Sequence, residues 1–238
     1  KDRAIVLRRL DYSETSQVLV LFTRLHGSQH LIAKGVKRGT KNKFSTGIDL
    51  LEHGQLVFLA KSDTHQGLGT LTECQQTNAY LGLRCNMQRW YCGQYAAEIT
   101  AAMTEVGDPH PDVFDALADL LGSLCTSEHA LPLLVEYQCA LLAEAGLWPD
   151  LTRCVNCDRT APQGRSAYYV AHQGGLICSN CQGSLADKRR ISAATLSALR
   201  QRDFNNASVS DAFNILDYTI SIAMNRQPAL TKFIRAGQ

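Results

Sequence analysis

Short alternating runs of apolar and polar residues mark the first 75 positions of the chain. Val, Ile, Leu and Phe are concentrated in five runs that are bounded by Gly, Ser, Asp or His, and such runs predict short β-strands. The five runs are residues 4–10, 17–22, 29–33, 55–60 and 68–74. Five short strands joined by turns favour a small antiparallel barrel. An OB-type barrel, whose face and loops commonly hold oligonucleotides, is the leading candidate.

From about residue 80 the apolar positions recur with the period of a helix. Helices are predicted near 80–105 and 112–125, and a third is well marked at both ends. Pro132 lies near its first turn, and Gly146 is placed to take the left-handed conformation after its last turn. Its core-facing side is expected to consist of Leu131, Leu134, Val135, Gln138, Cys139 and Leu142.

An irregular stretch rich in Pro and Gly, residues 147–185, separates these helices from later ones, and we expect an inserted module rather than a linker. Helical periodicity resumes at Ser192, and Ser208 is the candidate cap of a further helix. The apolar stripe of that helix is Val209, Ala212, Phe213, Leu216, Ile220 and Ala223. Helices on both sides of the insert are expected to pack into one bundle.

The insert contains two close pairs of cysteines, Cys154 with Cys157 and Cys178 with Cys181, and twenty residues separate the pairs. This spacing is typical of zinc sites, because two residues between thiolates let one turn present both sulfurs to one ion. Four thiolates complete the tetrahedron and leave no position for an activated water, so we expect one structural Zn²⁺. A redox dithiol or a degenerate site is the alternative. His172 is expected to be a solvent-facing loop residue, and residues 168–170 a short strand beside the site.

The fold class that follows is α+β: an N-terminal OB-fold β-barrel followed by an α-helical domain with an inserted four-cysteine zinc-binding module. The predicted boundaries are residues 1–76 for the barrel and 77–150 for the first part of the helical domain. Residues 151–186 form the insert, and 187–238 the second part of the helical domain.

Composition narrows the class of protein. An apolar content of 45% with 19% charged residues is ordinary for a globular chain. No stretch approaches the roughly 20 consecutive apolar residues of a membrane span, and the first nine residues are too charged for a secretory signal. We therefore expect an intracellular protein with no membrane partner. Nine cysteines without a secretion signal indicate reduced thiols or metal ligands. The five unpaired ones, Cys74, Cys85, Cys92, Cys125 and Cys139, are expected to be small buried hydrophobes.

The net charge of +2 conceals an uneven distribution. Residues 1–75 contain 11 Lys/Arg against 7 Asp/Glu, residues 76–153 contain 3 against 10, and residues 154–238 contain 10 against 5. A polyanion is attracted by the local potential rather than by the total charge, so the two basic ends are candidates for nucleic-acid contact.

A basic run follows the third predicted strand, with five cations within ten residues and no acid. A flexible cationic loop on a barrel suits contacts to backbone phosphates, and aromatic side chains offer faces for base stacking. The candidate DNA-binding residues are Lys34, Lys37, Arg38, Lys41 and Lys43, with Arg8 and Arg9 on a neighbouring strand; Arg24 is also close, and the aromatic candidates are Tyr12, Phe44 and Phe58. The alternative is a solvated loop with the aromatics in the barrel core. The chain has no P-loop, dinucleotide fingerprint, nucleophile elbow or zinc-protease motif, so we do not expect an enzyme.

The order of these features, with several local segments, resembles the bacterial recombination mediator family RecO. The segments are residues 4–15, 21–23, 33–38, 146–151 leading into Cys154 and Cys157, and 174–178, and the join between Trp148-Pro149-Asp150 and the first cysteine pair is the most specific. The likeness spans nearly the whole chain. Near the C-terminus the family often has a basic Leu-Lys-Ser-Arg-like run, where this chain has residues 230–235, Leu-Thr-Lys-Phe-Ile-Arg.

The resemblance implies the three-part architecture and a non-enzymatic, cytoplasmic, nucleoid-associated protein. Family members bind single- and double-stranded DNA, anneal complementary strands, and act with RecR on DNA coated by single-stranded-DNA-binding protein so that RecA can load. The main alternative is a zinc-ribbon and OB protein associated with RNA or transcription. A zinc hydrolase or nuclease is a third, but it would need an open coordination position.

Overall fold

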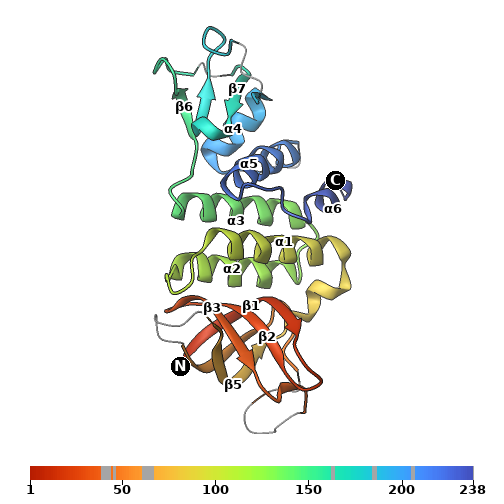
Figure 1. The fold of residues 1–238 in the computed structure, drawn as a ribbon. Helices are drawn as coiled ribbons and strands as arrows, with labels where there is room; N and C mark the ends of the chain where they lie inside the picture. The colour runs from red at the N-terminus through yellow and green to blue at the C-terminus, as the bar shows by residue number, and fades with distance from the viewer. Residues whose placement is uncertain are drawn as a thin grey trace. The chain divides into compact units, whose positions relative to one another are not determined.

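The computed structural model describes residues 1–38, 44, 47–60, 67–161, 164–183, 187–204 and 207–237. The chain divides into two compact units, Lys1–Glu128 and His129–Gln238, and Figure 1 traces the elements of each. Among the helices in the described ranges, none combines the length and the apolar character that crossing a bilayer requires.

The first unit begins with a closed five-stranded barrel. Its strands are β1 (Asp2–Asp11), β2 (Gln17–Thr23), β3 (Gly27–Ala33), β4 (His53–Leu59) and β5 (Gly69–Asn78). They follow the order β1-β2-β3-β5-β4, and β1 pairs with β4 to close the barrel. All pairs are antiparallel except β3 with β5. This is the five-stranded, OB-like barrel that the alternating pattern predicted.

The barrel interior is filled from alternate strand positions, as the two-residue period requires. Its buried cluster is Ala4, Val6, Leu19, Leu21, Leu31, Ala33, Val36, Phe44, Ile48, Leu56 and Leu71. The alternation breaks once in β1, where Val6 lies opposite Leu21 and Arg8 opposite Val20, so that Leu7 is an extra residue. This bulge turns Arg8 to the outer face, because Val20 alternates with the core residues Leu19 and Leu21.

Two helices complete the first unit. After the 3₁₀ helices η1 (Val36–Arg38) and η2 (Leu81–Cys85), the chain forms α1 (Met87–Met103) and α2 (Pro111–Leu124). The Asn86 side chain caps α1 by accepting from the backbone N–H groups of Gln88 and Arg89. Phe114 of α2 packs against Phe22 of the barrel with ring centroids 6.0 Å apart. These contacts place α1 and α2 with the barrel.

The second unit contains a four-stranded sheet and the remaining helices. The sheet has the order β6-β8-β7-β9, formed by β6 (Asp150–Cys154), β7 (Ala167–Val170), β8 (Gly175–Ile177) and β9 (Arg189–Ile191), with the 3₁₀ helix η3 (Ala171–Gln173) between β7 and β8. The helices are α3 (Ala130–Glu144), α4 (Ala193–Gln201), α5 (Val209–Ala223) and α6 (Thr231–Ala236). α5 packs against both α3 and α4, so helices before and after the sheet do share a core.

The predicted elements agree with the structure to within a few residues, and Gly146 has the expected positive φ of 67°. Three expectations were wrong. Residues 80–105 are not one helix, because the chain turns at Asn86 between η2 and α1. Ser208 makes no side-chain cap, because its own φ of −113° and ψ of −10° are nearly helical. Cys85 is exposed rather than buried, while Cys92 and Cys139 are buried as expected. The four domain boundaries stay a prediction, beside the observed division after Glu128.

Candidate metal centre and nucleic-acid interface

Both cysteine pairs lie in tight turns that follow paired strands. Cys154 ends β6 and Cys178 directly follows β8, and these two strands lie side by side in the sheet. The backbone N–H of Asp158 donates to the Cys154 carbonyl at 2.8 Å, and the N–H of Cys181 donates to the Cys178 carbonyl at 3.0 Å. Each turn therefore folds the second cysteine of its pair back towards the first.

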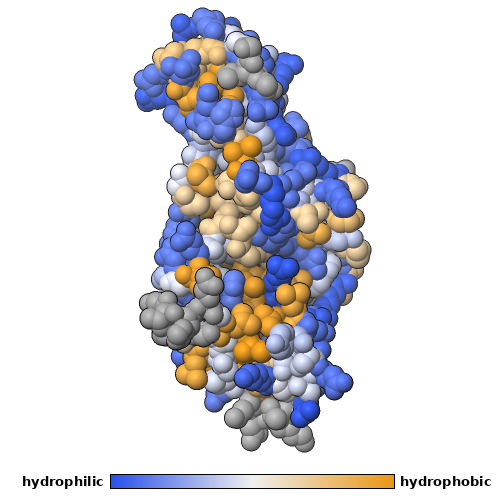
Figure 2. All heavy atoms as spheres, in the orientation of Figure 1, coloured by the Kyte–Doolittle hydropathy of each residue, from blue (hydrophilic) through white to orange (hydrophobic). Residues whose placement is uncertain are grey.

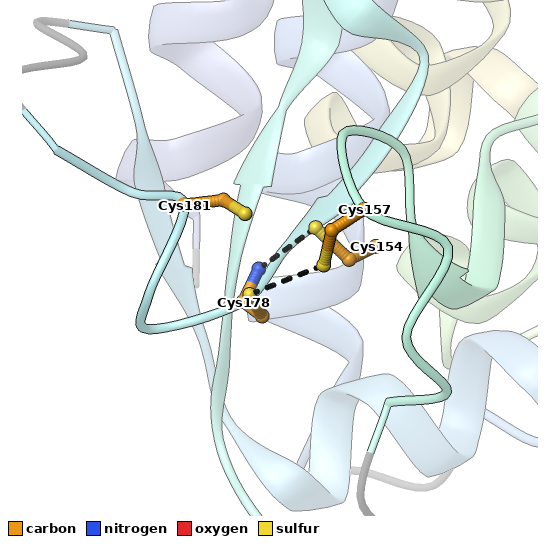
Figure 3. Close-up of side chains that lie close together, drawn as sticks. All are labelled: Cys154, Cys157, Cys178 and Cys181. Atoms are coloured by element: carbon orange, nitrogen blue, oxygen red, sulfur yellow. Dashed lines mark hydrogen bonds between the residues drawn. The ribbon is translucent and has the colours of Figure 1, made fainter.

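The four sulfur atoms of Cys154, Cys157, Cys178 and Cys181 lie within 4.8 Å of one another. Figure 3 shows the four side chains converging from the two turns. The Cys157 and Cys178 sulfurs are 3.7 Å apart, and the Cys178 backbone N–H donates to the Cys154 sulfur at 3.3 Å. Zn–S bonds of about 2.3 Å in a tetrahedron separate sulfurs by about 3.8 Å, so the observed spacing is close to that of a filled site.

The thiol pKa values show why the cluster suits a cation. Burial disfavours the Cys154 thiolate, but backbone N–H groups, that of Cys178 foremost, outweigh it and lower its pKa to about 6. A backbone hydrogen bond from Cys181 lowers the pKa of Cys178. At Cys181 the Asn156 side chain favours the thiolate, but the three neighbouring sulfurs prevail and raise its pKa to about 11. A metal ion would remove this repulsion and let all four sulfurs ionise.

The donor set is made of sulfur alone. His172 is exposed on η3 and is not part of the cluster, as expected. In the described part of the chain no other group of His, Cys, Asp or Glu is arranged to hold an ion. Four thiol sulfurs fit a soft or borderline metal such as zinc, and the four cysteines together could hold such an ion.

The barrel cations predicted to contact DNA differ in whether they have an acidic partner. Arg9 forms an ion pair with Asp49 at 2.9 Å, and Lys37 pairs with Asp11 at 3.1 Å. Arg8, Lys34 and Arg38 are exposed, and within the described ranges no carboxylate pairs with them. Lys41 and Lys43 lie outside the described residues.

Arg24 and the aromatic candidates have mainly structural places. Arg24 donates three hydrogen bonds to the carboxylate of Asp115 of α2, at 3.0, 3.1 and 2.7 Å. Phe44 is 8% exposed within the barrel core, and Phe58 packs against that core. Phe44 therefore belongs to the barrel core, the alternative expected for the aromatics, whereas Phe58 is only partly buried and stays a stacking candidate. Tyr12, directly after β1, is 69% exposed and keeps that role as a candidate.

The structure adds an apolar row that the sequence pattern missed. Leu10, Val18 and Ile32 lie opposite one another across β1, β2 and β3 on the outer face, in the row next to Arg8 and Val20. Leu10 is 51% exposed. Figure 2 shows apolar side chains gathered over the strands of the barrel. The two-residue period of a strand places Leu10 on the same face as the core residue Val6. The bulge at Leu7 moves Leu10 to the outer face, so the period alone does not predict this row.

Comparisons with known proteins cover nearly the whole chain. Residues 1–80 match the sequence model described as recombination protein O N terminal, and residues 84–221 match recombination protein O C terminal. The chain is 32% identical over 200 residues to the DNA repair protein RecO of Rhodopirellula baltica, covering 83% of this chain and 73% of that protein. It is 30% identical over 200 residues to that of Bacillus pumilus, covering 84% and 75%. These matches do not favour the zinc-ribbon RNA or transcription alternative.

Proposed function

Because the chain belongs to the recombination protein O family, we propose that it is a DNA repair and recombination mediator that binds single- and double-stranded DNA through its barrel. The observation that carries this proposal is the outer face of β1, β2 and β3. A partly exposed apolar row there lies beside Arg8 and Val20, while Lys34 directly follows β3 and Arg38 ends η1. Cations without acidic partners suit phosphates, and an apolar face with Tyr12 suits unpaired bases.

The mediator role extends beyond binding. We propose that the protein anneals complementary strands and, with RecR, helps RecA load on DNA coated by single-stranded-DNA-binding protein. It would act in the cytoplasm at the nucleoid and without catalysing a covalent step. Pull-downs of the purified protein with RecR and with a single-strand binder, each with and without a labelled oligonucleotide, test these partners. Binding to neither protein would contradict the mediator role.

The metal proposal is one structural Zn²⁺ held by Cys154, Cys157, Cys178 and Cys181. The support is the all-sulfur donor set with its near-tetrahedral spacing. When bound, zinc would supply cross-linking of the two turns rather than Lewis-acid chemistry, because four thiolates leave no open position. The apolar cluster beside the cysteines is small, namely Cys154, Val170 and Ile177 with Tyr168 against them, so the metal would contribute much of the local stability.

The DNA face is tested with the variant R8Q/K34Q/R38Q. Each phosphate contact on a single strand contributes about −0.7 to the slope of log affinity against log salt, so losing up to three contacts should flatten the slope by about 2. Fluorescence anisotropy with a labelled oligonucleotide at several salt concentrations measures the slope. Thermal stability should barely change, because exposed charges contribute little to folding.

The matched control is R202Q/R226Q/K232Q, which removes the same charge from exposed positions in the second unit. It should leave the slope almost unchanged. K41Q/K43Q measures the contribution of the predicted cations outside the described residues. A wild-type slope in R8Q/K34Q/R38Q would contradict the assignment of the DNA face.

A further inference from the structure

The metal-bearing sheet of the second unit has two different faces. On one face, Tyr169 shares a hydrogen bond of 2.6 Å with Thr219 of α5, and the Arg189 guanidinium lies 3.9 Å from the centre of the Tyr218 ring. This face is packed against α5. Tyr168 points the other way, because neighbouring strand residues alternate. Ile177 and Arg190 lie opposite Tyr168 on the two adjacent strands and therefore share its face.

A cavity of about 260 Å³ lies on the Tyr168 face, directly beside the cysteine cluster. Its apolar wall on this face is formed by Tyr168 and Ile177. Cys154 and Cys178 of the cluster line it too, and its polar lining includes Thr160, Ser166 and Ser179. Arg159 and Arg165 also line it. The Arg190 guanidinium reaches the Ser166 hydroxyl at 3.4 Å and so adds a third cation at the rim.

We call Arg159, Arg165 and Arg190 the metal-face patch. All three are exposed, and within the described part of the chain no carboxylate pairs with any of them. Another basic residue, Lys188, places its ammonium 5.4 Å from the centre of the Tyr168 ring. Arg153, on the edge strand β6, is different, because it is paired with Asp158 at 3.1 Å. The patch is therefore uncompensated positive charge around a partly apolar hollow.

The cysteine centre itself offers a competing explanation for these cations. Four thiolates with Zn²⁺ have a net charge of about −2, which two nearby arginines would balance. The third arginine and Lys188 still leave positive charge in excess. That excess, together with the adjoining cavity, points to an external anionic ligand.

We propose that the metal-face patch is a second nucleic-acid site, which binds a single strand. The guanidinium groups would hold consecutive phosphates, and the apolar wall of the cavity would receive an unpaired base. A duplex keeps its bases stacked inside and could use only the rim. The cavity is smaller than the roughly 300–1,000 Å³ of most small-molecule sites, so it suits one part of a longer ligand better than a whole cofactor. This site is additional to the barrel face and does not depend on it.

The test uses the full-length chain and the variant R159Q/R165Q/R190Q, with R202Q/R226Q/K232Q as the control of equal charge change. Binding of fluorescein-labelled oligo(dT) is followed over a range of salt. Losing two to three phosphate contacts should reduce the slope by about 1.4 to 2.1, and the control should keep the wild-type slope. Binding of a duplex should be affected less than that of the single strand.

Three further readouts separate the explanations. If the arginines only balance the cysteine centre, the patch variant would lose zinc and thermal stability while keeping its slope, and the proposal would be wrong. Loss of binding to a labelled poly-glutamate peptide, with oligo(dT) binding intact, would assign the patch to an acidic protein partner instead. Equal losses for single strand and duplex would overturn the single-strand assignment. Should the triple variant fold poorly, R190Q alone, away from the cysteines, should lower the slope by about 0.7.

The barrel variant keeps the two proposals distinguishable. If R8Q/K34Q/R38Q behaves like wild type while the patch variant loses binding, the barrel assignment fails and the second site stands. If only the barrel variant loses binding, the second site is refuted. Losses in both variants that add in the combined variant would support two independent sites.

Discussion

Among single residues, Tyr169 links the sheet that carries the cysteine cluster to α5, and this link makes the stability of the second unit depend on pH in the alkaline range. Burial raises the pKa of its phenol to about 12 from an ordinary 10. The folded state therefore favours the neutral phenol, and the contribution of this phenol to the free energy of unfolding is fully present below pH 10. It is lost as the pH rises from about 10 to 12, because the unfolded chain ionises first.

We predict that Tyr169→Phe has a flatter dependence of Tm on pH between about 10 and 12 than the wild type. Near neutral pH the free energy of unfolding of the variant should be about 1 kcal/mol lower, because the hydrogen bond to Thr219 is lost. Thermal unfolding followed by circular dichroism at a series of pH values measures both effects. Tyr12→Phe, at an exposed position, should match the wild type throughout. Equal alkaline slopes for Tyr169→Phe and wild type would contradict the prediction.

The role of a residue could be predicted when its partners lie close to it in the sequence. The cysteine cluster could be predicted because the two cysteines of each pair lie in one turn, only three positions apart. His172 could be excluded as a ligand because these four thiols already complete the site. The availability of the barrel cations could not be predicted. Arg9 is paired with Asp49, forty positions away, which also pairs with Arg84, and Lys37 of η1 is paired with Asp11 of β1. Only the folded barrel brings these charges together.

At the scale of elements, α6 is fastened to α5 by a buried carboxylate. Asp217 is 1% exposed; it accepts hydrogen bonds from the Thr231 hydroxyl at 2.7 Å and from the Arg235 guanidinium at 3.0 Å. Both partners lie in the C-terminal run of residues 230–235. This run therefore has a structural role, because Thr231 and Arg235 both donate to the buried Asp217 carboxylate.

Asp217→Ala should therefore lower the free energy of unfolding by about 3 kcal/mol, since breaking a buried, hydrogen-bonded ion pair is costly. Arg235→Gln should cost less, because Arg235 is partly exposed and the Thr231 hydroxyl still satisfies the carboxylate. Urea unfolding measures both values. Asp203→Ala, which changes an exposed acid in the same unit, is the control and should change stability little. A cost for Asp217→Ala no greater than that of the control would refute the role of this anchor.

Elements were predictable where a period repeats several times. All five barrel strands and the helix Val209–Ala223 could be located from the apolar pattern. The bulge at Leu7 was not, because one extra residue leaves the composition of β1 unchanged and shows only in its pairing with β2. The cap expected at Ser208 failed because residue type alone does not fix the backbone angles that a cap requires.

At the scale of the whole molecule, removal of the metal should affect the two units differently. Elemental analysis of protein purified without added metal should give about one zinc per chain. A chelator should then reduce hydrogen-exchange protection in the second unit, most strongly in residues 150–191. The barrel with α1 and α2 should keep its protection, because these elements form a separate compact unit.

Cys154→Ser should reproduce the effect of the chelator, since this cysteine is 2% exposed and accepts the Cys178 N–H. Cys85→Ser, which changes an exposed cysteine outside the cluster, is the control. Negligible zinc with all four thiols titratable would contradict the metal proposal. Loss of protection in the barrel as well would show that the units are not independent.

The composition of the whole chain suggested two basic ends, but the sequence alone did not show where the units divide. The polar break at residues 126–129 is marked in the sequence, but it does not differ in kind from the breaks between helices of the same unit. Which helix joins which core is decided by contacts distant in sequence, such as Phe114 with Phe22 in the first unit. Those contacts place α1 and α2 with the barrel, and α3 packs with α5.

The order of strands in the second sheet also bears on aggregation. The barrel closes on itself and has no free edge, whereas the described sheet β6-β8-β7-β9 ends on two outer strands. Exposed backbone at such an edge can pair with another copy of the chain, and natural proteins limit this with short, charged outer strands. β9 has three residues, two of them exposed arginines. The outer side of β6 is covered instead, because the Cys154 N–H donates to the Arg159 carbonyl and the Ala161 N–H donates to the Thr152 carbonyl. The β9 edge is therefore the one protected by charge. These cations discourage fibre-like stacking at high local protein concentration.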